Sequence, residues 1–168
     1  CKVTDDLYIG AFVMFGDVEL TVHCAAELLK RAPEYDYLIA PEAKAIPLLY
    51  EMARQSGAEK YFLARKGPKA YMSGVFEVHV KSITTMDVQR LVIDTTDAAL
   101  IKGKRILIVD DVISTGESLR AMEELVTRAG GSIVGRMAVL AEGAAQKRDD
   151  IIVLGDLPLF NPDGTVKA

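Results

Sequence analysis

The chain has 168 residues, of which 50% are hydrophobic and 26% are charged, and its formal net charge is −4. This length suits a single domain with a full hydrophobic core, and the composition is ordinary for a soluble globular protein. A negative charge argues against a general nucleic-acid binder, and no apolar stretch approaches the ~20 residues that cross a membrane. No signal peptide is visible, and Cys1 and Cys24 lack a metal-binding spacing, so we expect a cytoplasmic protein.

The first part of the chain predicts a helix, a strand and a second helix. Asp17 is a typical helix cap, and residues 18–31 carry the apolar spacing of a helix. Residues 37–40 predict a buried strand, and residues 48–55 predict a helix that Gly57 ends.

Two turns at strand ends carry charged side chains among small residues. The strand at 37–40 runs into Pro41-Glu42-Ala43-Lys44-Ala45-Ile46-Pro47, which leads to the second helix. A further strand, residues 59–64, runs into Arg65-Lys66-Gly67-Pro68-Lys69, which places three cations around a bend. Both turns therefore predict anion-binding loops.

The remaining elements fit an alternating pattern. Residues 75–80 alternate as one strand of an antiparallel ribbon does, and residues 91–93 are the candidate partner strand. Residues 132–141 and 151–154 predict two more strands, and the tail after them reads as a loop. Strands that alternate with helices predict a doubly wound α/β fold, with a mostly parallel sheet, helices on both faces and ligand loops at the carboxyl ends of the strands.

The segment from residue 106 to residue 118 carries the strongest functional signal. A short apolar strand at 106–109 precedes Asp110 and Asp111, and small or hydroxylated residues then lead into a helix with apolar residues at helical spacing. The free N–H groups of a helix start attract an anion, and small residues let a phosphate approach the backbone. Two carboxylates would repel that phosphate unless sugar hydroxyls or a divalent cation lie between them. A ribose phosphate with Mg²⁺ meets this condition.

Two other interpretations fit the segment less well. Adjacent acids after an apolar strand also open phosphorelay receiver domains, but there most of the sheet follows the acids, whereas here the acids come late in the chain. A purely structural strand-to-helix turn gives no reason for two acids before a Ser-Thr-Gly loop.

Residues 106–118 resemble the phosphoribosyl-pyrophosphate motif of the type I phosphoribosyltransferases. The resemblance implies that Asp110 and Asp111 grip the ribose diol and Mg²⁺ and are the catalytic acids. It also implies that the loop holds the ribose phosphate through Ser114, Thr115, Gly116, Glu117 and Ser118. Glu117 departs from the family, which usually has a small residue there, and we interpret it as an acid of the first helical turn that points away from the phosphate.

The same resemblance gives roles to the two charged turns. Residues 41–47 are similar to the family's pyrophosphate loop, which often contains a cis peptide bond, and they supply Glu42, Ala43, Lys44 and Ala45 as substrate-binding residues. The second turn is similar to the start of the mobile loop in the adenine-specific members, where cations reach the pyrophosphate, in part from a neighbouring subunit. Its cations are Arg65, Lys66 and Lys69. A homodimer is therefore expected.

The resemblance further implies a single domain over residues 1–168, with residues 1–16 as a small hood and residues 65–92 as a flexible lid. Val112 and an aromatic residue of the hood, Phe12 or Phe15, would sandwich the base. Adenine-specific members carry a Glu-Tyr pair in the lid, where this chain reads Thr84-Thr85-Met86-Asp87. The lid acid is therefore either replaced by Asp87 or absent.

The expected function is purine salvage. Oxopurine-specific members place a lysine just after the strand at 132–141, but this chain has none before Lys147, which favours adenine. The implied reaction moves phosphoribose from phosphoribosyl pyrophosphate to adenine and gives AMP and pyrophosphate, with Mg²⁺ as cofactor and no nucleic-acid or membrane partner. Two alternatives stay open: a xanthine or orotate phosphoribosyltransferase, and a non-catalytic regulator that binds phosphoribosyl pyrophosphate.

Overall fold

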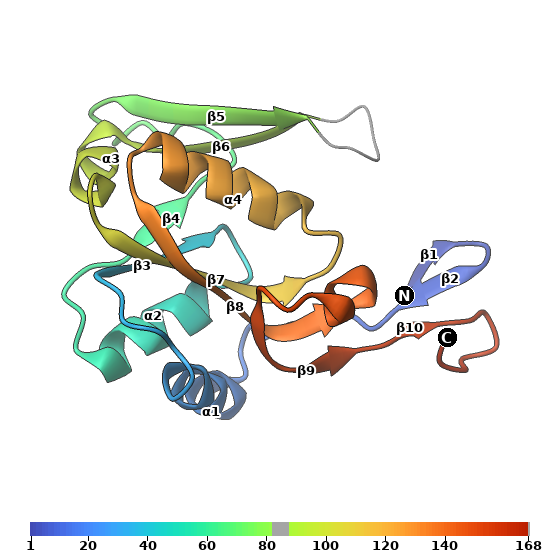
Figure 1. Ribbon diagram of the computed structural model, residues 1–168. Helices are drawn as coiled ribbons and strands as arrows, with labels where there is room; N and C mark the ends of the chain where they lie inside the picture. The colour runs from blue at the N-terminus through green and yellow to red at the C-terminus, as the bar shows by residue number, and fades with distance from the viewer. Residues whose placement is uncertain (82–87, 168) are drawn as a thin grey trace.

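The structure is a computed structural model that describes residues 1–81 and 88–167 (Figure 1). Its centre is a sheet of five parallel strands in the order β4-β3-β7-β8-β9. The strands are β3 (Tyr37–Pro41), β4 (Phe62–Ala64), β7 (Arg105–Ile113), β8 (Ser132–Glu142) and β9 (Ile152–Leu157). The predicted α/β fold with a parallel sheet is confirmed.

The strand order contains one reversal, between β3 and β7. From β3 the chain first moves outward to β4, then returns past β3 to β7 and continues in the opposite direction to β8 and β9. Tyr37 pairs with Ile106 and Ile39 with Ile108 across this junction. The loops after two such strands leave on opposite faces of the sheet and open a crevice, which is where ligands bind in open α/β sheets.

Helices cover both faces of the sheet, as predicted (Figure 1). One face packs against α1 (Val18–Leu29) and α2 (Ile46–Ser56), and the other packs against α4 (Glu117–Arg128), with α3 (Thr95–Ile101) at its edge. Asp17 caps α1 as expected, because its Oδ1 accepts the Leu20 N–H at 2.9 Å. Among the described residues no helix is long and apolar enough to span a membrane.

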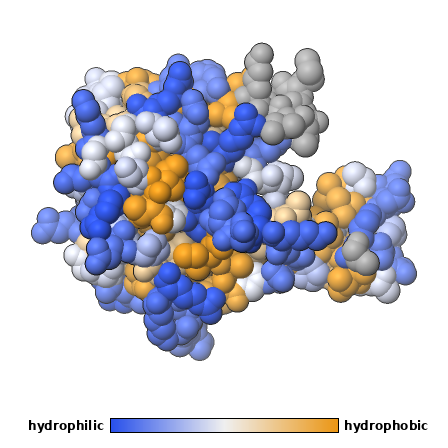
Figure 2. Space-filling model, in the orientation of Figure 1, coloured by the Kyte–Doolittle hydropathy of each residue, from blue (hydrophilic) through white to orange (hydrophobic). Residues whose placement is uncertain are grey.

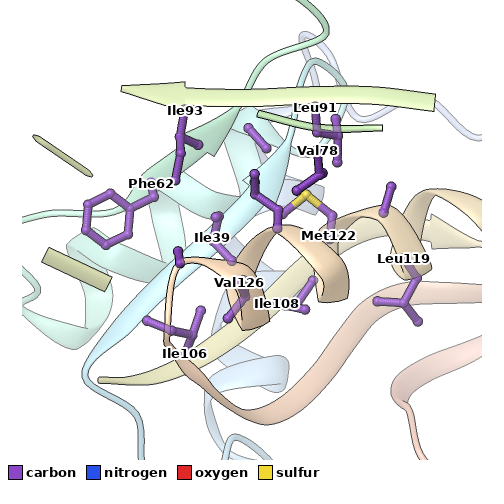
Figure 3. Packing of buried hydrophobic residues seen from close by; sticks show 14 of the residues in the cluster. Ile39, Phe62, Val78, Leu91, Ile93, Ile106, Ile108, Leu119, Met122 and Val126 are labelled. Atoms are coloured by element: carbon purple, nitrogen blue, oxygen red, sulfur yellow. The ribbon is translucent and has the colours of Figure 1, made fainter. Parts of the chain in front are cut away.

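The predicted ribbon is present and belongs to the core. Strands β5 (Val75–Lys81) and β6 (Val88–Asp94) pair antiparallel, with Val78 opposite Leu91. Both of these side chains are buried, and they pack together with Met122 of α4 in the cluster above the sheet (Figure 3). The ribbon therefore forms a third layer over α4.

Two strands and one helix differ from the sequence prediction. Strand β7 extends to Ile113, so the acid pair lies within the strand and not after it, because Asp110 and Val112 continue the ladder with Ala138 and Leu140 of β8. Strand β4 has only three residues. Helix α3 was not predicted, because seven residues are too few to show a helical period.

The tail of the chain is also not the predicted loop. Strands β1 (Lys2–Thr4), β2 (Leu7–Ile9) and β10 (Leu159–Phe160) form a small antiparallel sheet, which we call the terminal sheet. Figure 2 shows it as a lobe at the right, with hydrophobic residues on the side that faces the body. Both ends of the chain thus build one element beyond the carboxyl ends of β8 and β9 (Figure 1).

Candidate active site

A cavity of about 460 Å³ lies at the carboxyl edge of the sheet, at the junction of β3 and β7. This volume falls within the usual range for small-molecule sites. The turns after β3 and β7 supply most of its lining, and β6 and the segment after β4 close its side. The lining residues are Pro41, Glu42, Ala43, Lys44, Lys66, Gln89, Leu91 and every residue from Asp110 to Leu119.

The acid pair lies at the centre of the cavity wall. Asp111 is 3% exposed, and its Oδ2 lies 2.8 Å from Nζ of Lys44, across the junction of the two strands. The Asp111 N–H donates to Oδ1 of Asp110 at 2.8 Å. The pair is therefore held by its own backbone and by one cation from the opposite turn.

Burial and the neighbouring Asp111 carboxyl raise the pKa of Asp110 well above its ordinary value, although the Asp111 N–H and the Lys44 charge act in the opposite direction. Two carboxylates this close repel each other, and burial makes the second charge more costly. A positive partner at this place would favour ionisation of both acids.

The turn after β7 presents backbone donors to the cavity. Gly116 adopts φ +80°, a left-handed conformation that favours glycine, and helix α4 begins at the next residue. Within the described chain no side chain caps α4, and none caps α2. By contrast, Asp17 caps α1 and Asp94 caps α3. Helix α4, whose first residues line the cavity, therefore begins with backbone N–H groups that suit an anion, and the first of them, at Glu117, also lies 3.5 Å from Oγ1 of Thr115. The first residues of α2 do not line the cavity.

Glu42 joins the turn after β3 to the segment after β4. Its carboxylate accepts hydrogen bonds from Arg65 Nη1 at 3.0 Å and from the Lys66 N–H at 2.7 Å. Nζ of Lys69 lies 4.0 Å from Oε1 of the same carboxylate. Burial alone would raise the pKa of Glu42, but these hydrogen bonds and charges hold it below its ordinary value. The Glu42–Ala43 peptide bond is cis, in the loop where the family resemblance leads us to expect one.

Only one of the three predicted cations of this segment reaches the cavity. The backbone of Arg65 pairs with Val92 of β6 through two hydrogen bonds of 2.8 Å. Its side chain turns to Glu42, whereas Lys66 lines the cavity. Arg65 and Lys69 are therefore placed around Glu42, beside the cavity.

The structure brings most of the predicted site residues together, with two further exceptions. Ala45 is 1% exposed and belongs to the core under α2, and Phe12 packs against that same core without lining the cavity. Gln89 and Leu91 line the cavity but were not predicted, although the alternation of the ribbon places them on one face. Asp87 and the three residues before it lie outside the described residues.

The acid pair fits a magnesium ion that a phosphate ligand also holds. Oδ2 of Asp111 is buried and accepts no hydrogen bond from the described residues; Lys44 meets it only as an ion pair. In that same part of the chain no cluster of three or more His, Cys, Asp or Glu side chains forms a complete metal site. Magnesium does not require one, because it is usually held by one or two carboxylates, substrate phosphates and water.

Known proteins are similar to the chain in sequence. The model of the phosphoribosyl transferase domain family matches residues 21–157. The adenine phosphoribosyltransferase of Petrotoga mobilis is 27% identical over 151 residues, which are 88% of this chain and 72% of that protein. That of Thermotoga petrophila is 36% identical over 109 residues (65% and 60%). The orotate phosphoribosyltransferase of Caldanaerobacter subterraneus is 28% identical over 132 residues (77% and 58%).

Solved structures are similar in fold. The adenine phosphoribosyltransferase of Thermoanaerobacter pseudethanolicus matches with a TM-score of 0.69 at 24% identity, over 83% of this chain and 82% of that one. The Saccharomyces cerevisiae enzyme, solved with adenine and an imino-altritol bisphosphate, matches with a TM-score of 0.64 at 20% identity (83% and 78%). The family match spans both turns that build the cavity, and we conclude that the chain belongs to the phosphoribosyl transferase family.

Proposed function

We propose that the chain transfers phosphoribose from phosphoribosyl pyrophosphate to adenine and releases AMP and pyrophosphate. One observation carries this proposal: an acid pair, the uncapped start of α4 and two lysines meet in one cavity of suitable size. The adenine phosphoribosyltransferases among its relatives support the choice of reaction.

The turn after β7 would bind the ribose phosphate. Ser114, Thr115 and Ser118 offer hydroxyl donors, Gly116 leaves the backbone accessible, and the first turn of α4 lines the cavity. Hydrogen bonds to a charged group contribute about 1.5–3 kcal/mol each, so a few donors suffice to hold a phosphate against water. Asp110 and Asp111 would accept hydrogen bonds from the ribose diol.

The opposite side of the cavity would bind the diphosphate. Lys44 and Lys66 line that side. Glu42 holds the segment after β4 in place through Arg65 and the Lys66 N–H. Magnesium bound at Asp110 and Asp111 would supply the further positive charge that a diphosphate requires beside two acids.

The reaction exchanges one bond at C1 of the ribose for another. The bond from C1 to the diphosphate oxygen breaks and the bond from C1 to a base nitrogen forms, and the ring carries positive charge between these events. The proton of that nitrogen leaves to the released diphosphate or to water. Asp110 and Asp111 would stabilise that charge, and Lys44 and Lys66 would stabilise the leaving diphosphate; all four line the cavity. The ribbon, which we propose is the lid, would exclude water from the cavity through Gln89 and Leu91.

The end of β8 supports adenine as the base. This strand ends at Glu142, which is 8% exposed, whereas Lys147 is exposed and ends the short 3₁₀ helix Gly143–Lys147. No lysine stands at the end of β8 to meet an exocyclic oxygen, which favours a base with an exocyclic amino group. We propose that the base lies on Val112, under the terminal sheet as a hood, with Phe12 nearby.

A single domain over residues 1–168, a homodimer and a cytoplasmic location complete the proposal. The charged segment after β4 supports the dimer, because in relatives the corresponding loop reaches a neighbouring subunit. Light scattering of the purified protein tests the dimer directly: a mass of one chain at all concentrations would contradict it.

A pyrophosphate-release assay with phosphoribosyl pyrophosphate, Mg²⁺ and a panel of purines and pyrimidines tests the reaction. We expect release with adenine, and none with adenine when Mg²⁺ is chelated. If pyrophosphate is released only with orotate or only with xanthine, that base is the substrate in place of adenine. Orotate is the first alternative, because an orotate enzyme is among the relatives. Pyrophosphate-sensitive binding without turnover of any base would indicate a regulator and contradict the enzymatic proposal.

A further inference from the structure

The segment after β8 brings a guanidinium against the turn that follows β7. A Cβ added to Gly116 would meet Nη1 of Arg148 at 2.9 Å. Gly116 lines the cavity and immediately precedes the uncapped start of α4, whereas Arg148 does not line the cavity. Arg148 therefore lies beside the loop without lining the cavity.

The direction of this guanidinium is fixed by Asp150. Nε and Nη2 of Arg148 donate to the two carboxylate oxygens of Asp150 at 2.8 and 2.7 Å, which is the bidentate arrangement that fixes an arginine in orientation. Nη1 is the nitrogen left to face Gly116.

A second arginine connects this pair to the helix. Nε of Arg136, in β8, lies 4.0 Å from Oδ2 of Asp150. Arg136 also forms an ion pair with Glu123 of α4. The charged groups thus form a row from the flank of α4 to the loop at its start. This row places a positive charge beside Gly116 without use of any residue of the predicted motif.

A stabilising ion pair is a weak explanation for this arrangement. The side chains of Arg148 and Asp150 are 31% and 47% exposed, and ion pairs at such exposure contribute little to stability. The charge balance of the cavity gives a stronger one. Both cations that line the cavity within the described chain, Lys44 and Lys66, come from the side of β3 and β4, whereas the loop after β7 adjoins Asp110 and Asp111.

We propose that Arg148 is a positioning residue for the ribose phosphate: its guanidinium, held beside Gly116, strengthens the binding of a phosphate monoester by residues 114–118. The inference rests on the proposed function for the identity of the ligand. It extends the site to a residue far along the chain, which belongs neither to the acid pair nor to the loop.

Binding of ribose 5-phosphate, measured by titration calorimetry, tests this role apart from turnover. We expect Arg148→Gln to lower the affinity for ribose 5-phosphate about tenfold. The affinity for magnesium pyrophosphate should stay within about twofold of the wild-type value, because pyrophosphate binds on the opposite side of the cavity. Arg128→Gln is the matched control, since it removes the same charge from the far end of α4. It should change neither affinity.

Four further measurements separate positioning from a merely structural role. Arg148→Lys should recover part of the lost affinity through its charge, and Asp150→Asn should lose part of it because the guanidinium is no longer held. The double variant Asp150→Asn/Arg148→Gln should be no weaker than Arg148→Gln. The affinity lost in Arg148→Gln should also shrink as salt rises, because added ions screen a charge that acts at a distance.

Several outcomes would overturn the inference. Unchanged binding of ribose 5-phosphate in Arg148→Gln, equal losses for both ligands, or no binding by the wild type would each do so. If Arg148→Gln does not fold, Arg148→Lys and Asp150→Asn decide the question by the same two affinities. Failure of the proposed reaction is distinguishable, because it would appear as wild-type binding of ribose 5-phosphate without turnover of any base.

Discussion

The turns after β3 and β7 lie on opposite sides of one cavity and have similar backbone arrangements, but their charged and polar side chains are paired to different extents. Each leads a parallel strand into a helix that no described side chain caps. In the turn after β3 the charged groups are paired: Glu42 with Arg65 and the Lys66 N–H, and Lys44 with Asp111. In the turn after β7, hydroxyls and a left-handed glycine lie open to the cavity.

This difference indicates that one turn shapes the site and the other binds the phosphate. The paired turn forms a fixed rim that can hold a doubly charged group through Lys44 and Lys66. The open turn offers many weak donors in a small space, which suits a phosphate that must enter and leave. Charge pairing therefore marks the frame of the site, and free donors mark the ligand position.

The largest effect is expected where the two turns touch. Asp111→Asn should lower turnover about a hundredfold or more, because it removes a charge that faces the ribose in the transition state. Steady-state kinetics measures this, and the melting temperature should change by only a few degrees. The control Asp97→Asn removes a carboxylate that is also ion-paired, with Lys60 at 2.9 Å, on the distant helix α3. Unchanged turnover in Asp111→Asn would refute its assigned role.

Removing the cation of the paired turn should have the next largest effect. Lys44→Met should raise the KM for phosphoribosyl pyrophosphate about tenfold, because the diphosphate loses one charged partner and Asp111 loses its ion pair with Lys44. Lys30→Met, which removes an exposed lysine paired with Glu27, should leave the KM unchanged. Equal kinetics for the two variants would contradict a diphosphate site at Lys44.

A smaller effect should distinguish the open turn from ordinary glycine strain. Gly116→Ala should lower the free energy of unfolding by about 1–2 kcal/mol, because alanine is strained in a left-handed conformation. It should also lower the affinity for ribose 5-phosphate. Gly57→Ala meets the same strain at φ +71° at the end of α2, with no atom within 4 Å of the added Cβ. Gly57→Ala should lose a similar amount of stability, measured by urea unfolding, and should keep full affinity for ribose 5-phosphate. Loss of affinity in both variants would mean that strain alone explains the result.

The smallest effect concerns the paired rim and depends on pH. The pKa of Glu42 is lowered in the folded protein, so its ionised form adds stability above the unfolded value of ~4.3, and this contribution is lost as the pH falls through the folded pKa. Glu42→Gln should therefore reduce stability at pH 7 by about 1 kcal/mol or less. Urea midpoints of the two proteins should converge below about pH 4. A constant difference across this range would contradict the assignment.

The sequence predicted the elements that local pattern determines. The apolar runs of β3, β7 and β8 and the spacing in α1, α2 and α4 are visible without any partner, and so are the Asp17 cap and the alternation of the ribbon. The family motif placed Asp110, Asp111 and the loop at 114–118 in one site, and all of them line the cavity.

The remaining features depend on distant pairing. Strand β10 has two residues and exists because it pairs with β2 at the other end of the chain. The acids lie inside β7 because β8 continues beside them. Lys66 faces the cavity and Arg65 does not, because the Arg65 backbone pairs with Val92. The contact of Arg148 with Gly116 likewise joins segments that no local pattern connects.

The central claim is that residues 114–118 form the seat of a ribose phosphate, and NMR amide shifts of the labelled protein test it most directly. Addition of ribose 5-phosphate should move the amide signals of Ser114, Thr115, Gly116, Glu117 and Ser118 more than any others, in a saturable way. Free ribose at the same concentrations should not reproduce these shifts. Saturable binding that leaves these five amides unmoved would contradict the account.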